Sequence, residues 1–395
     1  MSPWLAGRGA ACAEPRVAKL LFHRKTTSTG GGDLRPHRFF VSTAGALEKR
    51  AKRLHKLCMA WNWKRSSLGQ FIYRWRYRIG EYALRGFTGV LPRIPHRLLV
   101  LLASVVARMT YAFLWKYRTR MEENVALAME REIPRASDRK ALVWRAWRNF
   151  AAAFLETTMV MHWSRAKIIS SIKVEGEEHL QEALSRGKGV IALSAHLGSF
   201  TMIGARLAAG GYPFSVVVKQ PRNERFARLI DDFRARVGLK TISAKPRKDA
   251  VRGILKALRD NHVVLVIADE FKSGGVMVSF MGRNSPAPRG PATLALRTGA
   301  LTLPMFALRQ GDGSLRLSIG AAIEPIAGGD LEQSVKATTA LFTDHLEQAI
   351  RRYPDQWNWL GFPRSKRIPR SEIGMSHSAV AKNSTVPRVS SQSPD

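Results

Sequence analysis

Short runs of β-branched and aliphatic residues alternate with amphipathic segments through this chain from about Ile172 onward. The strand-like runs are SIKVEG, GVIALSAH, FSVVVKQ, VVLVIADE, GVMVSF, LTLPMFALR and LRLSIG; the helical segments between them include EEHLQEALSRG, NERFARLIDDFRARVG, KDAVRGILKALRDN and GPATLALRTGA. Strands that alternate with helices of about 10–15 residues form βαβ units. We therefore predict an α/β domain over 166–370, with a mixed, largely parallel sheet flanked by helices.

Residues 66–165 have a different composition, rich in Arg, Trp and Leu, and predict a basic helical N-terminal layer. The most hydrophobic piece is HRLLVLLASVVARMTYAFLWKYR, whose apolar core runs only from Leu98 to Ala107 before Arg108. A bilayer-spanning helix needs about 20 apolar residues. The segment therefore predicts either a helix lying in the membrane interface or one buried against the main domain, and both interpretations remain open.

The two ends of the chain have low-complexity sequences. Residues 1–65 include TTSTGGGD, have few periodic apolar positions and lack the continuous apolar run of a signal peptide. Residues 371–395 are rich in serine and almost free of large apolar side chains. We predict a poorly ordered basic region at the first end and a disordered tail at the other.

The chain is strongly basic, with 64 Lys and Arg against 30 Asp and Glu and a formal net charge of +34. Such a charge attracts nucleic acid, anionic membrane surfaces and acidic proteins. No zinc-finger spacing or RNA-recognition signature is present, so specific nucleic-acid binding is not predicted. The two cysteines, Cys12 and Cys58, lie outside any ligand-like cluster, and we predict neither a disulfide framework nor a metal site.

The segment GVIALSAHLGSFTMIG ends an apolar run at His196 and follows it with a turn glycine. No nucleophile elbow, phosphate loop, dinucleotide fingerprint or zinc-binding spacing surrounds this histidine. Ligands of parallel sheets bind outside the carboxyl ends of the strands. A histidine there can act as a general base if a carboxylate or carbonyl holds its other ring nitrogen. A second strand ends at Asp269 and Glu270. The alternative is a purely structural histidine.

Several blocks of the chain together resemble one family. GVIALSAHLGSFTMIGARLAAGGYPFSVVVKQPRNERF is similar to the first two blocks of the lysophospholipid acyltransferase superfamily, in its lipid A late-acyltransferase branch. ADEFKSGGVMVSFMGRNSPAPRGPATLALRTGALTLPMFALR resembles the third and fourth blocks, and RTRMEENVALAM and RYPDQWNWLGFPRSK add smaller similarities. The resemblance covers roughly 72–368.

This resemblance implies a glycerol-phosphate-acyltransferase-like fold and transfer of a fatty acyl chain from a thioester, on acyl carrier protein or CoA, to a lipid hydroxyl. It implies no metal, no cofactor and no acyl-enzyme. The family motif is His-x-x-x-x-Asp/Glu, in which the histidine deprotonates the acceptor and the acid orients it. His196 matches the histidine, but Thr201 stands at the acid position.

Three interpretations of Thr201 are open. In the first, which we favour, the enzyme is active and His196 is held by a backbone carbonyl, by Thr201 or by a carboxylate elsewhere, with Asp269 and Glu270 the best-placed candidates. In the second the enzyme is weakened, since loss of an orienting carboxylate can lower turnover by about 10⁴. In the third the protein binds lipid without catalysis.

Other positions are assigned by the resemblance and by local chemistry. Arg283 and Arg289 flank a proline-stiffened loop, and a helix is predicted to begin at Gly290. Arginine at a helix start suits a phosphate, and the resemblance implies that Arg289 lies near the acceptor's phosphate or the donor. Arg222 and Asn223 match the second block and would help to shape the site.

Two further features have two interpretations each. Glu156 matches a family position, and a buried acid on an apolar helix needs a partner, for which we predict an arginine of the helical layer. The stripe of Trp357, Trp359 and Phe362, followed by Arg364, Lys366 and Arg367, is either an interfacial anchor or part of the packing against the sheet.

The charge agrees with the partners that the resemblance implies. Acyl carrier protein is acidic, the cytoplasmic leaflet is anionic, and a phosphorylated glycolipid acceptor is negative as well. We therefore expect a peripheral or monotopic protein on the cytoplasmic face of the bacterial inner membrane, with acyl carrier protein or acyl-CoA as donor and a lipid as acceptor.

Overall fold

The computed structural model describes residues 75, 78, 82, 86, 96–160, 163–219, 224–272 and 274–364. The chain divides into two units, Met1–Arg74 and Trp75–Asp395, and every described residue belongs to the second. The predictions of a poorly ordered region over 1–65 and a tail over 371–395 fall outside the described residues.

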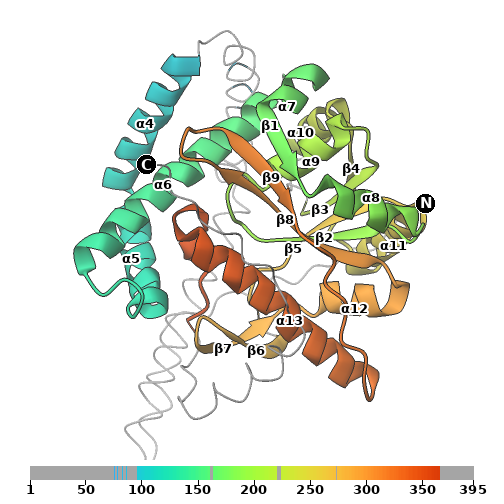
Figure 1. Ribbon diagram of the computed structural model, residues 1–395. Helices are drawn as coiled ribbons and strands as arrows, with labels where there is room; N and C mark the ends of the chain where they lie inside the picture. The colour runs from blue at the N-terminus through green and yellow to red at the C-terminus, as the bar shows by residue number, and fades with distance from the viewer. Residues whose placement is uncertain are drawn as a thin grey trace, which may run out of the picture. The chain divides into compact units, whose positions relative to one another are not determined.

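A seven-stranded sheet forms the centre of the described unit (Figure 1). Its strand order is β1-β9-β8-β2-β5-β3-β4, and every neighbouring pair is parallel except β8 with β9. The strands are β1 Ile172–Glu175, β2 Val190–Ser194, β3 Phe214–Val218, β4 Leu239–Ser243, β5 Val263–Ile267, β8 Leu301–Arg309 and β9 Leu315–Ile319. The predicted mixed, largely parallel sheet is confirmed.

The sheet is covered on both faces, and β2 shows why its sequence is continuously apolar. Val190 and Ala192 belong to one buried core, while Ile191 and Leu193 belong to another. All four are fully buried, as expected of a central parallel strand with helices on either side. The helices of this part are α8 Glu177–Ser185, α9 Thr201–Ala209, α10 Glu224–Arg236, α11 Arg247–Arg259, α12 Gly290–Thr298 and α13 Leu331–Arg352.

Two strands were not predicted. The edge strand β4 has the sequence LKTIS, whose polar residues weaken the strand pattern. The segment interpreted as a proline-stiffened loop is instead β7 Arg283–Ala287, which pairs antiparallel with β6 Val276–Phe280 in a separate hairpin. Pro286 is tolerated because a two-stranded hairpin consists of edge strands, where proline's missing N–H can face away from the ladder. Met281 and Gly282 form the tight turn, both with positive φ.

Helices α4 His96–Phe113, α5 Trp115–Met129 and α6 Ala136–Val160 lie within the predicted helical layer of 66–165, and α7 Arg165–Ser171 follows directly before β1. In Figure 1, α4 and α5 lie beside the long helix α6. Tyr111 of α4 packs edge-on against Trp144 and Trp147 of α6. Within the described residues, no helix has both the length and the apolar character needed to span a membrane.

The segment after α13 packs inside the protein. It contains two short 3-10 helices, η2 Pro354–Gln356 and η3 Trp359–Gly361. Trp357, Trp359 and Phe362 are 2%, 0% and 3% exposed, so the interpretation of these rings as an interfacial anchor is wrong and the packing alternative is correct. Arg364 binds Asn124 of α5. Lys366 and Arg367 lie outside the described residues.

Candidate active site

His196 lies just beyond the carboxyl end of β2, at the centre of the sheet. Strands β2 and β5 are parallel neighbours in which Ser194 pairs with Ile267. His196 follows Ser194 by two residues, and Asp269 follows Ile267 by two. Equal extension of two paired strands therefore places these two side chains side by side, as expected where parallel strands end at the same edge of a sheet.

Asp269 holds His196 at two points. The imidazole Nδ1 of His196 lies 2.8 Å from Oδ1 of Asp269, and the backbone N–H of His196 donates to Oδ2 at 2.8 Å. The indole Nε1 of Trp357 also donates to Oδ2, at 2.8 Å. The Asp269 side chain is 3% exposed and that of His196 is 30% exposed. A buried, fully hydrogen-bonded carboxylate thus holds a histidine that remains open to solvent.

The electrostatics favour the protonated form of His196. Burial alone would lower the pKa of this imidazole, but the hydrogen bond and charge of Asp269, together with the charge of Glu270, outweigh burial and raise the pKa above its ordinary value. Because Nδ1 faces a carboxylate, the neutral ring carries its proton on Nδ1 and has a free lone pair on Nε2. This is the tautomer that a general base requires.

The Asp269-Glu270 pair divides into two different environments. Glu270 has an exposed side chain and forms an ion pair with Lys272. It therefore reaches His196 only through its charge, whereas Asp269 makes the contact. Of the possible partners proposed for His196 from the sequence, the structure brings Asp269 to it.

Thr201 begins helix α9 and has its contact on the helical layer. Its hydroxyl lies 2.7 Å from the hydroxyl of Thr157, near the end of α6.

The loop between His196 and Thr201 is tightly packed. Gly198 has φ +59°, and a Cβ there would lie 2.2 Å from the carbonyl oxygen of Ala307, so glycine is required at this turn.

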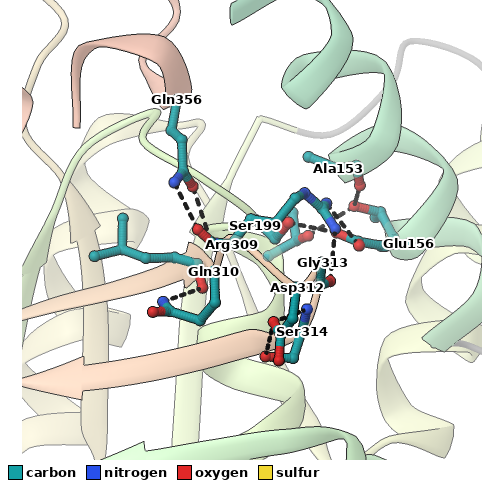
Figure 2. Close-up of polar contacts among 12 residues, drawn as sticks. Ala153, Glu156, Ser199, Arg309, Gln310, Asp312, Gly313, Ser314 and Gln356 are labelled. Carbon is teal, nitrogen blue, oxygen red and sulfur yellow. Dashed lines mark hydrogen bonds and ion pairs between the residues drawn. The ribbon is translucent and has the colours of Figure 1, made fainter. Parts of the chain in front are cut away.

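Glu156 of α6 also contacts this loop (Figure 2). Its carboxylate accepts a hydrogen bond from Ser199 Oγ at 2.5 Å and pairs with Arg309 at 2.6 Å. Arg309 is the last residue of β8, so the prediction of an arginine from the helical layer is wrong. Helix α6 packs against α9, and Glu156 on α6 is close to the end of β8. Its partner is therefore Arg309 at that strand end, not an arginine of the helical layer.

Residues 356–358 form a further wall of the site. The sequence predicted no role for Gln356 or Asn358, and for Trp357 it predicted either an interfacial anchor or packing against the sheet. The side chain of Gln356 accepts from the backbone N–H of Arg309 at 2.9 Å and donates to its carbonyl at 2.8 Å. The N–H of Asn358 donates to the carbonyl of His196 at 3.1 Å. The only available signal was the resemblance of RYPDQWNWLGFPRSK to the family, which identifies the block but not its contacts.

Of the predicted substrate-binding residues, the structure describes Arg283, Arg289 and Gly290. Arg283 is in β7, with its guanidinium 5.9 Å from the ring centroid of Phe362. Arg289 directly precedes α12, which begins at Gly290 as predicted, and pairs with Glu332 of α13 at 2.5 Å. Arg222 and Asn223 lie outside the described residues. In the part of the chain that the structure describes, no group of three or more His, Cys, Asp or Glu side chains is arranged to hold a metal ion.

Comparison with known proteins gives several relatives. The phosphatidylinositol mannoside acyltransferase of Mycolicibacterium smegmatis is 26% identical over 217 residues, which cover 54% of this chain and 68% of that protein. The phosphatidylinositol mannoside acyltransferase of Mycobacterium tuberculosis H37Rv is 29% identical over 189 residues, 47% of this chain and 58% of that one. The lipid A biosynthesis acyltransferase of Haemophilus influenzae is 24% identical over 188 residues, 47% and 56%.

The chain thus spans between 56% and 68% of the length of these relatives. The family described as bacterial lipid A biosynthesis acyltransferase matches residues 72–365, well over half of the chain and the whole of the sheet and its site. This chain therefore belongs to the bacterial lipid A biosynthesis acyltransferase family.

Proposed function

We propose that this protein moves a fatty acyl chain from a thioester, on acyl carrier protein or CoA, to a hydroxyl of a lipid A precursor or a related phosphoglycolipid, with His196 as the general base. The observation that supports this most is the pair of hydrogen bonds from His196 to the buried Asp269. They orient the ring and select the tautomer with a free Nε2.

The reaction needs one base and one proton donor, and the same histidine serves as both. Nε2 of His196 takes the proton of the acceptor hydroxyl as its oxygen attacks the thioester carbonyl carbon. A carbon–oxygen bond forms, the carbon–sulfur bond then breaks, and the imidazolium returns the proton to the departing thiolate. Asp269 stabilises the imidazolium between the two transfers. The products are an ester and a free thiol.

In this proposal Asp269 does the work that the family motif assigns to the acid at Thr201. A carboxylate needs only the correct distance and direction to orient an imidazole, and its chain position is immaterial. The alternative function, an impaired or inactive homologue that binds lipid, follows from the absence of an acid at position 201. In its non-catalytic form, that alternative predicts that His196 is dispensable.

The acceptor class is inferred from the relatives and from the exposed arginine that directly precedes α12. The relatives above are named for phosphatidylinositol mannoside and for lipid A. The exposed pair of Arg289 with Glu332 is weak in solvent, so a lipid phosphate would replace Glu332 at little cost. Phosphate binding by Arg283, Arg289 and Gly290, with help from Arg222 and Asn223, stays a prediction.

The test is acyl transfer by the full chain from labelled acyl carrier protein and labelled acyl-CoA into three acceptors: a lipid A precursor, phosphatidylinositol mannoside and a lysophospholipid. The proposal expects an ester product with at least one glycolipid acceptor. Transfer confined to the lysophospholipid would overturn the acceptor class. No transfer to any acceptor, with the lipids bound, would favour the lipid-binding alternative.

The pH dependence of turnover follows from the electrostatics of His196. A general base must be neutral, and Asp269 and Glu270 raise the pKa of His196 above its ordinary value. We therefore expect kcat to fall as the pH drops through that raised pKa, and the acid limb to move to lower pH when Asp269 is replaced by asparagine. Rates from about pH 5 to about pH 9 test this. An acid limb at the same pH in both proteins would contradict it.

The His196–Asp269 contact also makes the stability of the fold depend on pH, in the opposite direction to turnover. A raised pKa in the folded state means that the His196–Asp269 contact stabilises the protein fully below the unfolded pKa of histidine and loses that contribution as the pH rises through the folded pKa. Turnover and this part of the stability therefore change in opposite directions over the same pH range.

The helical layer offers a surface for a membrane. Exposed apolar and aromatic side chains gather along α4, the α4–α5 junction and α6, namely Val105, Val106, Met109, Phe113, Leu114, Trp115, Tyr117, Phe150 and Phe154. Arg108 and Lys116 lie over the rings of Trp144 and Trp115. Aromatic rings interleaved with cations suit the headgroup region of an anionic bilayer. We propose peripheral or monotopic docking on the cytoplasmic face of the bacterial inner membrane.

Binding to vesicles tests this surface. Phe113 and Phe154 are 76% and 64% exposed, and the double change Phe113→Ser with Phe154→Ser is expected to weaken binding to anionic phospholipid vesicles by about tenfold, the equivalent of roughly 1.4 kcal/mol. The control is Val251→Ser with Met277→Ser, which changes exposed apolar residues on α11 and β6. Equal loss of binding in both double variants would contradict the assignment.

A further inference from the structure

The segment 356–358 runs antiparallel against the loop that carries His196. Leu197 pairs with Trp357 in an isolated antiparallel bridge. The N–H of Asn358 donates to the carbonyl of His196 at 3.1 Å. This segment therefore holds the main chain of the histidine directly.

The side chain of Trp357 holds the partner of that histidine. Its indole Nε1 donates to Oδ2 of Asp269 at 2.8 Å. The same oxygen accepts from the backbone N–H of His196, and Oδ1 lies against Nδ1 of the ring, both at 2.8 Å. Two of these three contacts come from His196 itself and the third comes from Trp357. Because the Asp269 side chain is 3% exposed, the indole fixes the carboxylate where water has little access.

The Trp357 ring is itself held in place. It is 2% exposed, and its centroid lies 4.8 Å from that of Trp359 and 5.8 Å from that of Phe280, both in edge-on contacts. The preceding residue, Gln356, binds both the N–H and the carbonyl of Arg309 with its side chain (Figure 2). Protein interiors are close-packed, so a ring enclosed in this way keeps one orientation. Its N–H stays directed at the carboxylate.

The indole N–H affects both members of the pair. It places the positive end of its dipole on Asp269, which stabilises the ionised carboxylate that must face Nδ1 of His196. It also weakens the attraction of that carboxylate for the proton on Nδ1. The indole therefore aligns the ring through the carboxylate and limits how far the pKa of His196 is raised.

We propose that Trp357 is a positioning residue for acyl transfer: its indole holds the Asp269 carboxylate in the plane that aligns His196. This role rests on the function proposed above. Trp357 acts through Asp269 and not on the reacting atoms. A tryptophan that only filled the core could be replaced by phenylalanine without any change in the properties of the base.

The first test is Trp357→Phe, which keeps an aromatic ring in the core and removes the indole N–H. We expect kcat, measured at a pH above the acid limb, to fall by about tenfold, as for the loss of a hydrogen bond to a charged group. KM should stay within about twofold. The carboxylate keeps its two bonds to His196 but can turn, which misaligns the base and not the substrate.

The same variant is expected to move the acid limb of kcat to higher pH. Without the indole dipole the carboxylate attracts the imidazolium more strongly, so the pKa of His196 rises further. The charged groups that act on the ring, Asp269, Glu270 and Lys272, are unchanged. The slightly stronger base does not offset the loss of alignment. The direction is opposite to the one expected for Asp269→Asn.

A second replacement at the same position keeps the core filled. Benzothienylalanine, incorporated at position 357 alone, has the shape of tryptophan, with sulfur in place of the N–H. It is expected to give the same decrease in kcat and the same movement of the acid limb as Trp357→Phe. A variant that folds is therefore at hand if phenylalanine is not tolerated.

The matched control is Trp359→Phe. Trp359 is 0% exposed and packs against Trp357, and its Nε1 donates to the carbonyl of Pro354 at 2.7 Å. This change also removes a buried indole donor, but the acceptor is a backbone carbonyl. Both phenylalanine variants are expected to melt below wild type. Trp359→Phe is expected to keep kcat within about twofold of wild type and to leave the acid limb in place.

The pKa of His196 gives a readout that needs no substrate. It is measured by NMR titration of protein with isotope-labelled histidine; the chain has ten histidines, and His196→Ala identifies the resonance by its absence. The pKa is expected to be higher than in wild type in both replacements of Trp357, and unchanged in Trp359→Phe.

Each outcome decides one of the two proposals. Wild-type kcat in the replacements of Trp357, a loss of equal size in Trp359→Phe, or an acid limb that stays in place or moves to lower pH would overturn the role of Trp357 and leave the acyltransferase proposal standing. If wild type transfers nothing, the acyltransferase proposal fails and the titration decides the rest. A higher pKa of His196 in the replacements of Trp357 but not in Trp359→Phe still supports control of the ring by the indole, and an unchanged pKa overturns it.

Discussion

Replacing His196 with alanine is expected to lower kcat by about 10³-fold, within the range of 10²–10⁴ that a positioned general base contributes. The ring lies at the carboxyl end of β2, with Nδ1 on Asp269 and a side chain that is 30% exposed. Without Nε2 the acceptor hydroxyl keeps its proton during the attack on the thioester. KM should change little, because this interaction develops only as the proton moves.

The control for this variant is a histidine of the same domain outside the site. His179 lies on α8, and His179→Ala is expected to retain the rate of wild type. Thermal melting of both variants shows whether the fold is intact. A His196→Ala protein that melts like wild type and still transfers at the wild-type rate would remove the basis for the general-base mechanism.

Asp269→Asn is expected to lower kcat by a comparable amount, roughly 10³-fold to 10⁴-fold, by analogy with hydrolytic triads. The amide has almost the shape of the carboxylate and its oxygen can still accept from Trp357 and from the backbone N–H of His196. Its NH₂ group, however, then faces Nδ1, which must become the acceptor. The proton moves to Nε2, and the lone pair that would deprotonate the acceptor is lost.

The matched comparison for Asp269 is Glu270→Gln. Glu270 is exposed and pairs with Lys272, so this change removes a nearby negative charge without touching the ring. The charge of Glu270 contributes to the raised pKa of His196, so its removal is expected to move the acid limb slightly to lower pH. Above that pKa a small decrease in kcat is expected, because the imidazole is then a slightly weaker base. If Asp269→Asn remained fully active while His196→Ala did not, the orienting partner would have to be another group, such as Thr201 or a backbone carbonyl.

The arrangement of β2 and β5 could be predicted because it depends on local sequence patterns. Both strands are continuous apolar runs that end in a polar residue, and parallel strands end at one edge of a sheet. That reasoning brought His196 and the Asp269-Glu270 pair together. The sequence pattern could not decide whether Asp269 or Glu270 contacts His196. Neighbouring side chains point in different directions, and a shift of one residue in strand register would bring Glu270 to the position of Asp269.

The contacts that complete the site could not be predicted, because they come from segments far apart in the chain. Trp357 is 88 residues from Asp269, whose carboxylate it holds. Its sequence neighbourhood, WNWLGF, is equally typical of an interfacial anchor, and burial alone decides between the two. Likewise the partner of Glu156 depends on how α6 packs against α9 and β8, which no local pattern records.

Local chemistry also misled the prediction at 283–289. Proline at Pro286 and Pro288 suggested a stiff loop, whereas the hairpin of β6 and β7 accommodates Pro286 opposite Met277. Proline is disfavoured only in the interior strands of a sheet, and a two-stranded hairpin has no interior strand. The helix start at Gly290 agrees with the prediction, and Pro291 occupies the first turn of α12, where proline is favoured.

The measurement that tests the central claim most directly is transfer of a labelled acyl chain from its thioester to a glycolipid acceptor by wild type and His196→Ala at one pH above the pKa of His196. The account predicts a labelled ester with wild type and a rate lower by about 10³-fold with His196→Ala. Equal rates in the two proteins, or no ester from wild type with any glycolipid acceptor, would contradict it.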